Sequence, residues 1–395
     1  MLITGSGIVA LSMLAACVAD DDLSVATPTT VSTPPTVSTP TTDATNTDPS
    51  STTSSSPSDE PSDDAAIAAT RTMFTSITPD LPGCTVAASR GGQVVYAEAF
   101  GAARLDPLEP MTTATIVDIG STSKQFTATA LLLLAQRGEV DLDAAVSASL
   151  DGLPGWADEV TLRQMMHHES GIPDYIELLL DRGFSFAEVT TDTDTLEALG
   201  EVSELDFAPG TSWEYSNSNY FLMGQVVLAV TGDDLGTFLA EEVFTPLGLD
   251  MVMDPTAVIP EKAVSYTGTG DSTVVADSPW QQLGDGAIQT TPSQLVQWAS
   301  QYWSPTVGSP AIADARLDQA AAAEDAGSYG AGIFASDDEE LGQVLQHSGG
   351  WGGFVTMFYV APDLEMAVAA TCTSPDSAEL LDFELNLLRI WAATA

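Results

Sequence analysis

The sequence is short of positive charge. Ten Lys and Arg residues face 56 Asp and Glu residues, which gives a formal net charge of −46. Such a chain has no basic surface to displace counterions from phosphates, which excludes non-sequence-specific nucleic-acid binding and argues against a polybasic membrane patch. Because charged residues make up only 17% of the chain, against about 25% in typical domains, cations are missing rather than acids added. The charge either solubilises the protein or adapts its surface to salt.

Long apolar runs are also scarce, and none reaches the roughly 20 residues that a membrane-spanning helix needs. The short apolar segment 1–17 ends in Leu14-Ala15-Ala16-Cys17, which resembles a bacterial lipoprotein signal in which Cys17 is lipidated. It departs from such a signal in one respect, because the first basic residue is Arg71 rather than one near the start. We expect an exported protein anchored through Cys17 in the cell envelope, with plain secretion as the alternative.

The next segment, 18–64, consists largely of Thr, Ser, Pro and Asp. It cannot bury enough apolar surface to offset its chain entropy, so it predicts a disordered acidic linker. The remainder, 65–395, has the apolar content of a folded domain. We therefore expect a signal (1–17), a linker (18–64) and one folded domain (65–395).

Strand patterns occur at both ends of the folded region and helical patterns between them. The predicted strands are 84–90 and 93–100, joined at Gly91-Gly92, and 343–347, 354–360 and 366–372; the predicted helices are 124–137 and 377–393. This order predicts an α/β fold of the α+β type, with one antiparallel sheet built from both ends of the chain and flanking helices. The sheet subdomain would comprise 65–125 and 285–395, and a mostly helical subdomain 126–284.

One candidate nucleophile stands at a strand-to-helix junction, in Ser121-Thr122-Ser123-Lys124. A serine hydroxyl is a weak nucleophile and needs a base within hydrogen-bond reach. Residues three apart share a helix face, so this spacing places the Lys124 amine beside Ser121. The helix N-terminus offers backbone N–H groups to an oxyanion and disfavours a charged amine. The chain has only two lysines, Lys124 and Lys262. Because lysine is so scarce, a surface lysine without a role is less expected at this position.

Two further segments carry polar groups that can face a cleft. Tyr215 and Asn217 stand two apart in a turn, and His347-Ser348-Gly349-Gly350 combines a histidine with glycines that let a substrate approach a strand closely. Taken alone, these segments are equally consistent with a capping turn and a strand histidine. The remaining histidines, His167 and His168, are adjacent.

The order of the three motifs resembles the serine beta-lactamase and penicillin-binding-protein superfamily, in particular its class C-type branch of esterases and D-Ala-D-Ala carboxypeptidases. The resemblance covers about 80–395, and supporting matches lie at 161–175, 207–220, 245–248 and 284–288. It implies a beta-lactamase/transpeptidase-like fold.

The resemblance also implies residue roles. Ser121 is the acylated nucleophile, and Lys124 and Tyr215 share the general-base and general-acid work, in an order that stays open. Asn217 holds Lys124 and a substrate amide, and His347 aids proton transfer or binds a carboxylate. The remaining binding positions are Ser348, Gly349 and Gly350, and the backbone N–H groups of Ser121 and Gly350 form the oxyanion hole. By contrast, His168, Glu169 and Asp285 are expected to shape loops.

The third motif is His-Ser-Gly rather than the Lys-Thr-Gly of most true beta-lactamases. A carboxypeptidase or esterase is therefore expected more than a beta-lactamase. An α/β-hydrolase would need G-x-S-x-G, and a zinc hydrolase H-E-x-x-H; neither occurs. We expect no metal and no cofactor, a small-molecule or peptide substrate, and an unspecified oligomeric state. A stalled acyl-enzyme that senses penicillin and an inert surface domain remain alternatives.

Beyond Cys17, the chain contains only Cys84 and Cys372. Two thiols in an exported protein allow a disulfide, although free buried cysteines are an equal alternative. The resemblance implies that the first strand lies antiparallel to the last, which would bring Cys84 to Cys372 and favours a disulfide.

Overall fold

The computed structural model describes residues 63–323, 326–379, 381 and 385–394. The predicted signal with Cys17, and all but the last two residues of the predicted linker, lie outside these residues. In the described ranges, no helix has both the length and the hydropathy to cross a bilayer.

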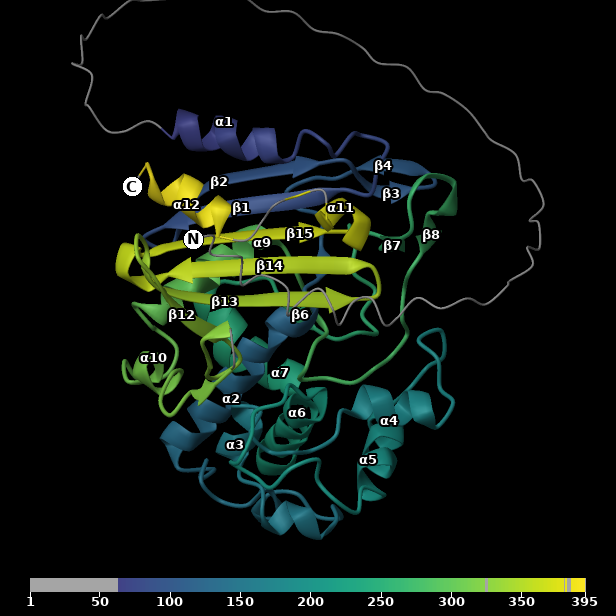
Figure 1. Ribbon diagram of the computed structural model, residues 1–395, viewed down its shortest axis with the longest axis vertical. Coiled ribbons are helices and arrows are strands. Elements are labelled where there is room, and N and C mark those ends of the chain that lie inside the picture. Colours follow the sequence, from purple (N-terminus) through teal and green to yellow (C-terminus); the bar gives the residue numbers. More distant parts are fainter. Residues whose placement is uncertain (1–62, 324–325, 380, 382–384, 395) are drawn as a thin grey trace, which may run out of the picture.

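An eight-stranded antiparallel sheet forms the upper half of the molecule (Figure 1). Its order is β10-β11-β12-β13-β14-β15-β1-β2. The strands are β1 (Cys84–Arg90), β2 (Gln93–Phe100), β10 (Ala321–Ala322), β11 (Ser328–Tyr329), β12 (Phe334–Asp338), β13 (Gly342–Trp351), β14 (Phe354–Ala361) and β15 (Met366–Cys372). β1, the first strand of this sheet in the sequence, pairs antiparallel with β15, the last in the sequence. Their register runs from Cys84 opposite Cys372 to Arg90 opposite Met366. The predicted sheet from both ends of the chain is confirmed.

Helices cover both faces of this sheet. Because strand side chains alternate between faces, Val86 packs in one core with Phe74 and Trp391, whereas its neighbour Ala87 packs in the other core with Trp298. The first core is closed by α1 (Asp64–Met73) and α12 (Asn386–Ala392), and the second by α9 (Pro292–Trp298).

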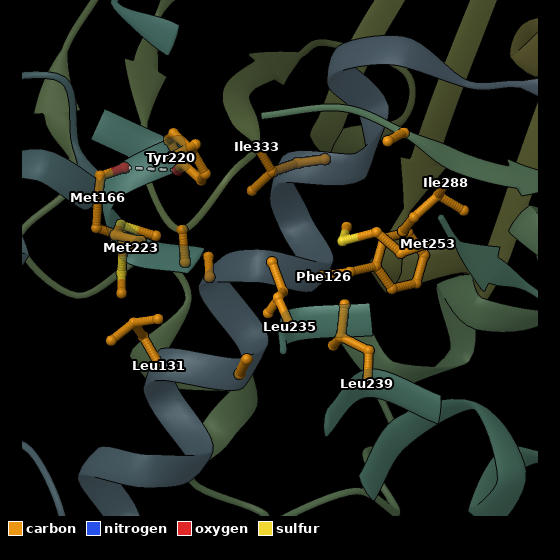
Figure 2. Close-up of a cluster of buried hydrophobic side chains, with 14 of the residues drawn as sticks. Phe126, Leu131, Met166, Tyr220, Met223, Leu235, Leu239, Met253, Ile288 and Ile333 are labelled. Carbon is orange, nitrogen blue, oxygen red and sulfur yellow. Dashed lines mark hydrogen bonds between the residues drawn. The ribbon is translucent and has the colours of Figure 1, made fainter. Parts of the chain in front are cut away.

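The second core continues into the helical half of the molecule. Its centre is α2 (Lys124–Arg137), which is buried from Lys124 to Leu134 and packs against α6 (Asn217–Thr231) and α7 (Leu235–Leu239). Figure 2 shows α2 residues surrounded by apolar side chains from these helices and from Met253 and Ile288. A helix buried on all sides is hydrophobic all round, which fits the Ala- and Leu-rich sequence of α2.

The remaining elements are short. The helices are α3 (Leu162–Met166), α4 (Tyr175–Asp181), α5 (Asp192–Gly200), α8 (Thr245–Leu247), α10 (Ile312–Ala315) and α11 (Pro375–Glu379). The strands are β3 (Ala102–Leu105), β4 (Leu108–Pro110), β5 (Val117–Asp118), β6 (Val252–Met253), β7 (Tyr266–Thr267), β8 (Val274–Val275) and β9 (Ile288–Thr290).

Two boundaries differ from the sequence prediction. The strand predicted at 343–347 extends to Trp351, through the glycines of the third motif. The single helix predicted at 377–393 is wrong, since the structure has α11 and α12 there as two helices. They serve different neighbours: α11 lies against β7, β14 and β15, whereas α12 packs on α1 as well as on β14 and β15.

Candidate active site

The hydroxyl and the amine predicted to react lie together at the start of α2. Ser121 is in a single 3₁₀ turn, Gly120–Ser123, that leads directly into the helix at Lys124. The Lys124 Nζ lies 3.1 Å from the Ser121 Oγ, and it donates to the Asn217 Oδ1 and to the Asp285 carbonyl oxygen at 2.7 Å each. A neutral amine has two N–H bonds and one lone pair. With both N–H bonds occupied, the lone pair of Lys124 is left for the serine proton.

Burial supports the neutral form of this amine. The Lys124 side chain is fully buried, and this burial lowers the pKa of Lys124, although the carboxyl groups of Asp285 and Asp174 oppose the shift. The sequence pointed to the helix N-terminus as the cause of a lowered pKa, whereas in the structure the main cause is desolvation of the amine. Burial also raises the pKa of Asp285, against the effect of Lys124.

Tyr215, which comes from the helical half of the molecule, lies close to the same two groups. The Lys124 Nζ lies 4.9 Å from the centre of the Tyr215 ring. The buried Tyr215 hydroxyl has no hydrogen-bond partner of ordinary geometry among the described residues. Ser121 is nevertheless close enough to lower the pKa of Tyr215, but burial outweighs it and raises that pKa well above 10. The phenol is therefore protonated at neutral pH and free to donate to a bound group.

Asn217 is held in place by a residue that the sequence did not single out. Its backbone N–H and its Nδ2 both donate to the Asp174 Oδ2 at 2.8 Å, while the Asp174 Oδ1 caps α4 by accepting from the Ile176 N–H at 2.9 Å. This contact fixes the side-chain amide of Asn217 with its oxygen toward Lys124. The sequence signals only the helix cap at Asp174, not the second bond.

His347 lies on β13 as a buried, neutral ring. Its Nε2 lies 3.1 Å from the Tyr329 hydroxyl and its Nδ1 lies 2.5 Å from the Ser348 carbonyl oxygen. Burial, and secondarily the nearby Lys124, lowers the pKa of His347 to about 3. This histidine therefore presents no positive charge near pH 7, which weighs against the expected carboxylate binding.

The glycines of the third motif let β13 pass directly beside the Ser121 turn. A Cβ on Gly349 would lie 1.9 Å from the Ile119 carbonyl oxygen, and a Cβ on Gly120 would lie 2.6 Å from the Gly350 nitrogen. Pairing between β12 and β13 ends at Gln346, so from His347 onward the strand borders the site with one edge unpaired by β12. The backbone of Gly350 and the nucleophile are thus neighbours.

His168 belongs to the site rather than only to a loop. Its buried ring lies 4.3 Å from the Tyr215 ring and 4.7 Å from the Tyr329 ring, measured between centroids. The Asp285 carbonyl oxygen also contacts Lys124 directly. The sequence signalled neither contact, because adjacency in the chain says nothing about which distant ring a side chain meets. Nothing in the contacts of Glu169 assigns it more than the loop role expected.

Cys84 and Cys372 are joined by a disulfide at the paired ends of β1 and β15. In the described part of the chain, no group of three or more His, Cys, Asp and Glu side chains is arranged to hold a metal ion.

A hydroxyl beside a buried amine, at the start of a helix below an antiparallel sheet, is the arrangement of an activated serine nucleophile. The chain matches the Beta-lactamase family model over residues 66–389. The chain therefore belongs to this family of serine hydrolases with the beta-lactamase fold.

Known proteins similar to this chain fall in the same group. Penicillin-binding protein 4* of Bacillus subtilis is 26% identical over 300 residues, which are 69% of this chain and 64% of that protein. The D-aminopeptidase of Brucella canis is 31% identical over 225 residues, which are 55% of this chain and 42% of that protein. The chain thus spans about two thirds or less of their lengths. The solved octameric penicillin-binding protein homologue from Pyrococcus abyssi has the same fold, with a TM-score of 0.70 and 22% identity over 82% of this chain and 76% of that one.

Proposed function

We propose that this protein hydrolyses an ester or amide through an acyl intermediate on Ser121. The observation that carries the proposal is the 3.1 Å approach of the Lys124 Nζ to the Ser121 Oγ, with the two other directions of the amine occupied by Asn217 and Asp285. No surface lysine needs such an enclosure.

The geometry supports one division of labour between the two candidate bases. Lys124, with its lowered pKa, takes the Ser121 proton as the serine attacks the carbonyl carbon, since the Tyr215 phenol is protonated at neutral pH. The oxyanion is received by the backbone N–H groups of Ser121 and Gly350. Tyr215 donates its proton to the leaving group and is reprotonated from Lys124; water then releases the acyl group by the reverse sequence.

The charge of the site supports a proposal for the substrate class. A D-Ala-D-Ala carboxypeptidase must bind a terminal carboxylate, and the neutral, doubly hydrogen-bonded His347 offers it no positive charge. We propose a neutral ester or an amide, including the amide of a D-amino acid, which is consistent with the similarity to a D-aminopeptidase.

A panel of p-nitrophenyl esters, D-amino acid amides, D-Ala-D-Ala peptides and nitrocefin, tested on the purified protein, checks this proposal. We expect ester or amide turnover. A stable fluorescent-penicillin adduct without turnover would instead support the alternative, a penicillin sensor that acylates and stalls. If the protein shows neither turnover nor a stable penicillin adduct, both the hydrolase and the sensor proposals are refuted.

Site variants test the residue roles. Ser121→Ala should abolish turnover, and Lys124→Ala and Tyr215→Phe should each lower kcat/KM by about 10²- to 10⁴-fold, the scale of a lost acid-base group. Lys262→Ala is the matched control, because it removes the other lysine of the chain and should leave turnover within about threefold. A near-native rate in Lys124→Ala would show that Lys124 is not the base.

We further propose that the protein is exported and anchored through a lipid on Cys17, on the strength of the Leu14-Ala15-Ala16-Cys17 segment. Radioactive palmitate should label the wild-type protein in a bacterial host and not Cys17→Ala. Equal labelling of both would rule out this anchor.

A further inference from the structure

His168 combines two features that are unfavourable for folding. Its φ is +60°, a conformation that non-glycine residues rarely adopt. Its Nε2 is buried and has no hydrogen-bond partner in the described ranges, which is uncommon for buried polar atoms. Such outliers concentrate where a structure needs a particular geometry for function.

The hydrogen bonds of the His168 ring and of its carbonyl oxygen lead to the segment around Tyr215, whereas its own N–H donates to the Met165 carbonyl oxygen. Its Nδ1 lies 3.1 Å from both the Ser216 N–H and the Asn219 Nδ2, and its carbonyl oxygen accepts from the Glu214 N–H at 3.0 Å. Because Nδ1 accepts, the ring proton is on Nε2. The residues before and after Tyr215 are thereby tied to one side chain and its own backbone.

The ring of His168 also contacts the ring of Tyr215 directly, at 4.3 Å between centroids with 31° between the planes. The Tyr215 hydroxyl lacks a hydrogen bond of ordinary geometry among the described residues. Ring packing must therefore set the position of the phenol, and its closest ring neighbour in the site is His168, ahead of Tyr329 and His347, both 6.3 Å away.

We propose that His168 is a positioning residue that holds the Tyr215 phenol against Ser121 and Lys124. It acts through its ring contact and through the three hydrogen bonds to the segment around Tyr215, and touches no reacting atom. Burial, and the nearby Lys124, also keep the pKa of His168 well below 6.5, so it adds no second positive charge beside Lys124. This inference rests on the proposed function and deepens it.

A double-mutant cycle separates positioning from general structural support. His168→Phe keeps a ring but loses the acceptor, and we expect kcat for an ester to fall about 10- to 100-fold with little change in KM. In the Tyr215→Phe background the same substitution should cost less than about threefold, because the hydroxyl it positions is gone. An equal loss in both backgrounds would overturn the proposal.

The adjacent His167 provides the control. It is also buried, and neither of its ring nitrogens has a hydrogen-bond partner of ordinary geometry in the described region. His167→Phe should therefore affect the unfolding midpoint as His168→Phe does, without the selective loss of kcat. Where His168→Phe does not fold, His168→Asn serves in the same cycle, because asparagine tolerates positive φ.

A second readout does not depend on turnover. In protein labelled with 3-fluorotyrosine, the ¹⁹F signal missing from Tyr215→Phe identifies Tyr215. We expect this signal to shift or broaden in His168→Phe and to stay in place in His167→Phe. An unmoved signal would overturn the positioning role even if the wild type hydrolysed no substrate, a result that by itself would refute only the proposed function.

Discussion

At the scale of single residues, the site depends on Lys124, a side chain that prefers water but is buried here. Lys124 gives up water for three protein oxygens, and the resulting loss of solvation favours its uncharged form. Asp174 and Asp285 limit the shift by favouring the charged form. These opposing effects leave neither the neutral nor the charged form of the amine strongly favoured. This suits a group that must take and return a proton in each cycle.

This placement predicts the pH dependence of turnover. The base is active only when Lys124 is uncharged, so kcat/KM should fall as the pH falls through the pKa of Lys124. Because that pKa is lowered, the fall should lie below the ordinary lysine value of about 10.4. A pH–rate profile on a neutral ester measures it.

His347 provides the control for this assignment. Its pKa is lowered to about 3, so it stays neutral across the working range. His347→Gln should leave the acidic limb of the profile at the same pH, whatever it does to the rate. A limb that disappears in this variant would assign the titration to the histidine instead of the lysine.

At the scale of elements, the site is a contact between the 3₁₀ turn Gly120–Ser123 and β13. The two backbones approach too closely for a side chain between them, and for this reason the strand carries glycines where it passes the nucleophile. The nucleophile and the strand that borders it are therefore set by one packing contact.

Gly349→Ala tests this contact. The added Cβ would overlap the Ile119 carbonyl oxygen at 1.9 Å, so β13 must move away from the Ser121 turn. We expect a loss of about 1–3 kcal/mol in the free energy of unfolding together with a lower kcat/KM, measured by denaturant unfolding and ester hydrolysis.

Gly286→Ala is the matched control in the same region, because its Cβ would have only ordinary contacts, the nearest at 3.8 Å from Gly120. A native-like Gly349→Ala would show that the turn and the strand are not in forced contact.

At the scale of the whole molecule, the two ends of the domain are joined in one sheet. β1 lies between β2 and β15, and the disulfide connects Cys84 to Cys372 across 288 positions of the sequence. The helical half is inserted between these ends (Figure 1). Its residues Tyr215 and Asn217 lie against Lys124, beside the nucleophile.

The disulfide should act on stability and not on the chemistry. Cys84 and Cys372 lie in the core under α1 and α12, which is distinct from the core that contains α2. Replacing both by Ala should lower the free energy of unfolding by about 2–4 kcal/mol, chiefly by freeing the unfolded chain, while kcat at low temperature stays native. Denaturant unfolding with and without reductant measures the change. A selective loss of kcat with unchanged stability would contradict it.

Elements with strong local signals could be predicted from the amino-acid sequence alone. The β1–β2 hairpin and α2 have the predicted bounds, because a Gly-Gly turn, alternating β-branched residues and a C-terminal glycine act through neighbours in the chain. The close pair Ser121 and Lys124 was equally readable, since spacing on one helical turn fixes it. The closing helix was mispredicted, since the structure has two helices there, of which α11 also contacts β7 and α12 also contacts α1.

The rest of the site depends on tertiary contacts and could not be predicted from the sequence. That Asp174 holds Asn217, that the His168 ring contacts the Tyr215 ring and that His347 is neutral depend on burial and on contacts between segments far apart in the chain. Desolvation is a property of the assembled core, and no local pattern encodes it. The sequence therefore supplies the reacting groups, whereas the fold supplies their distances and their protonation states.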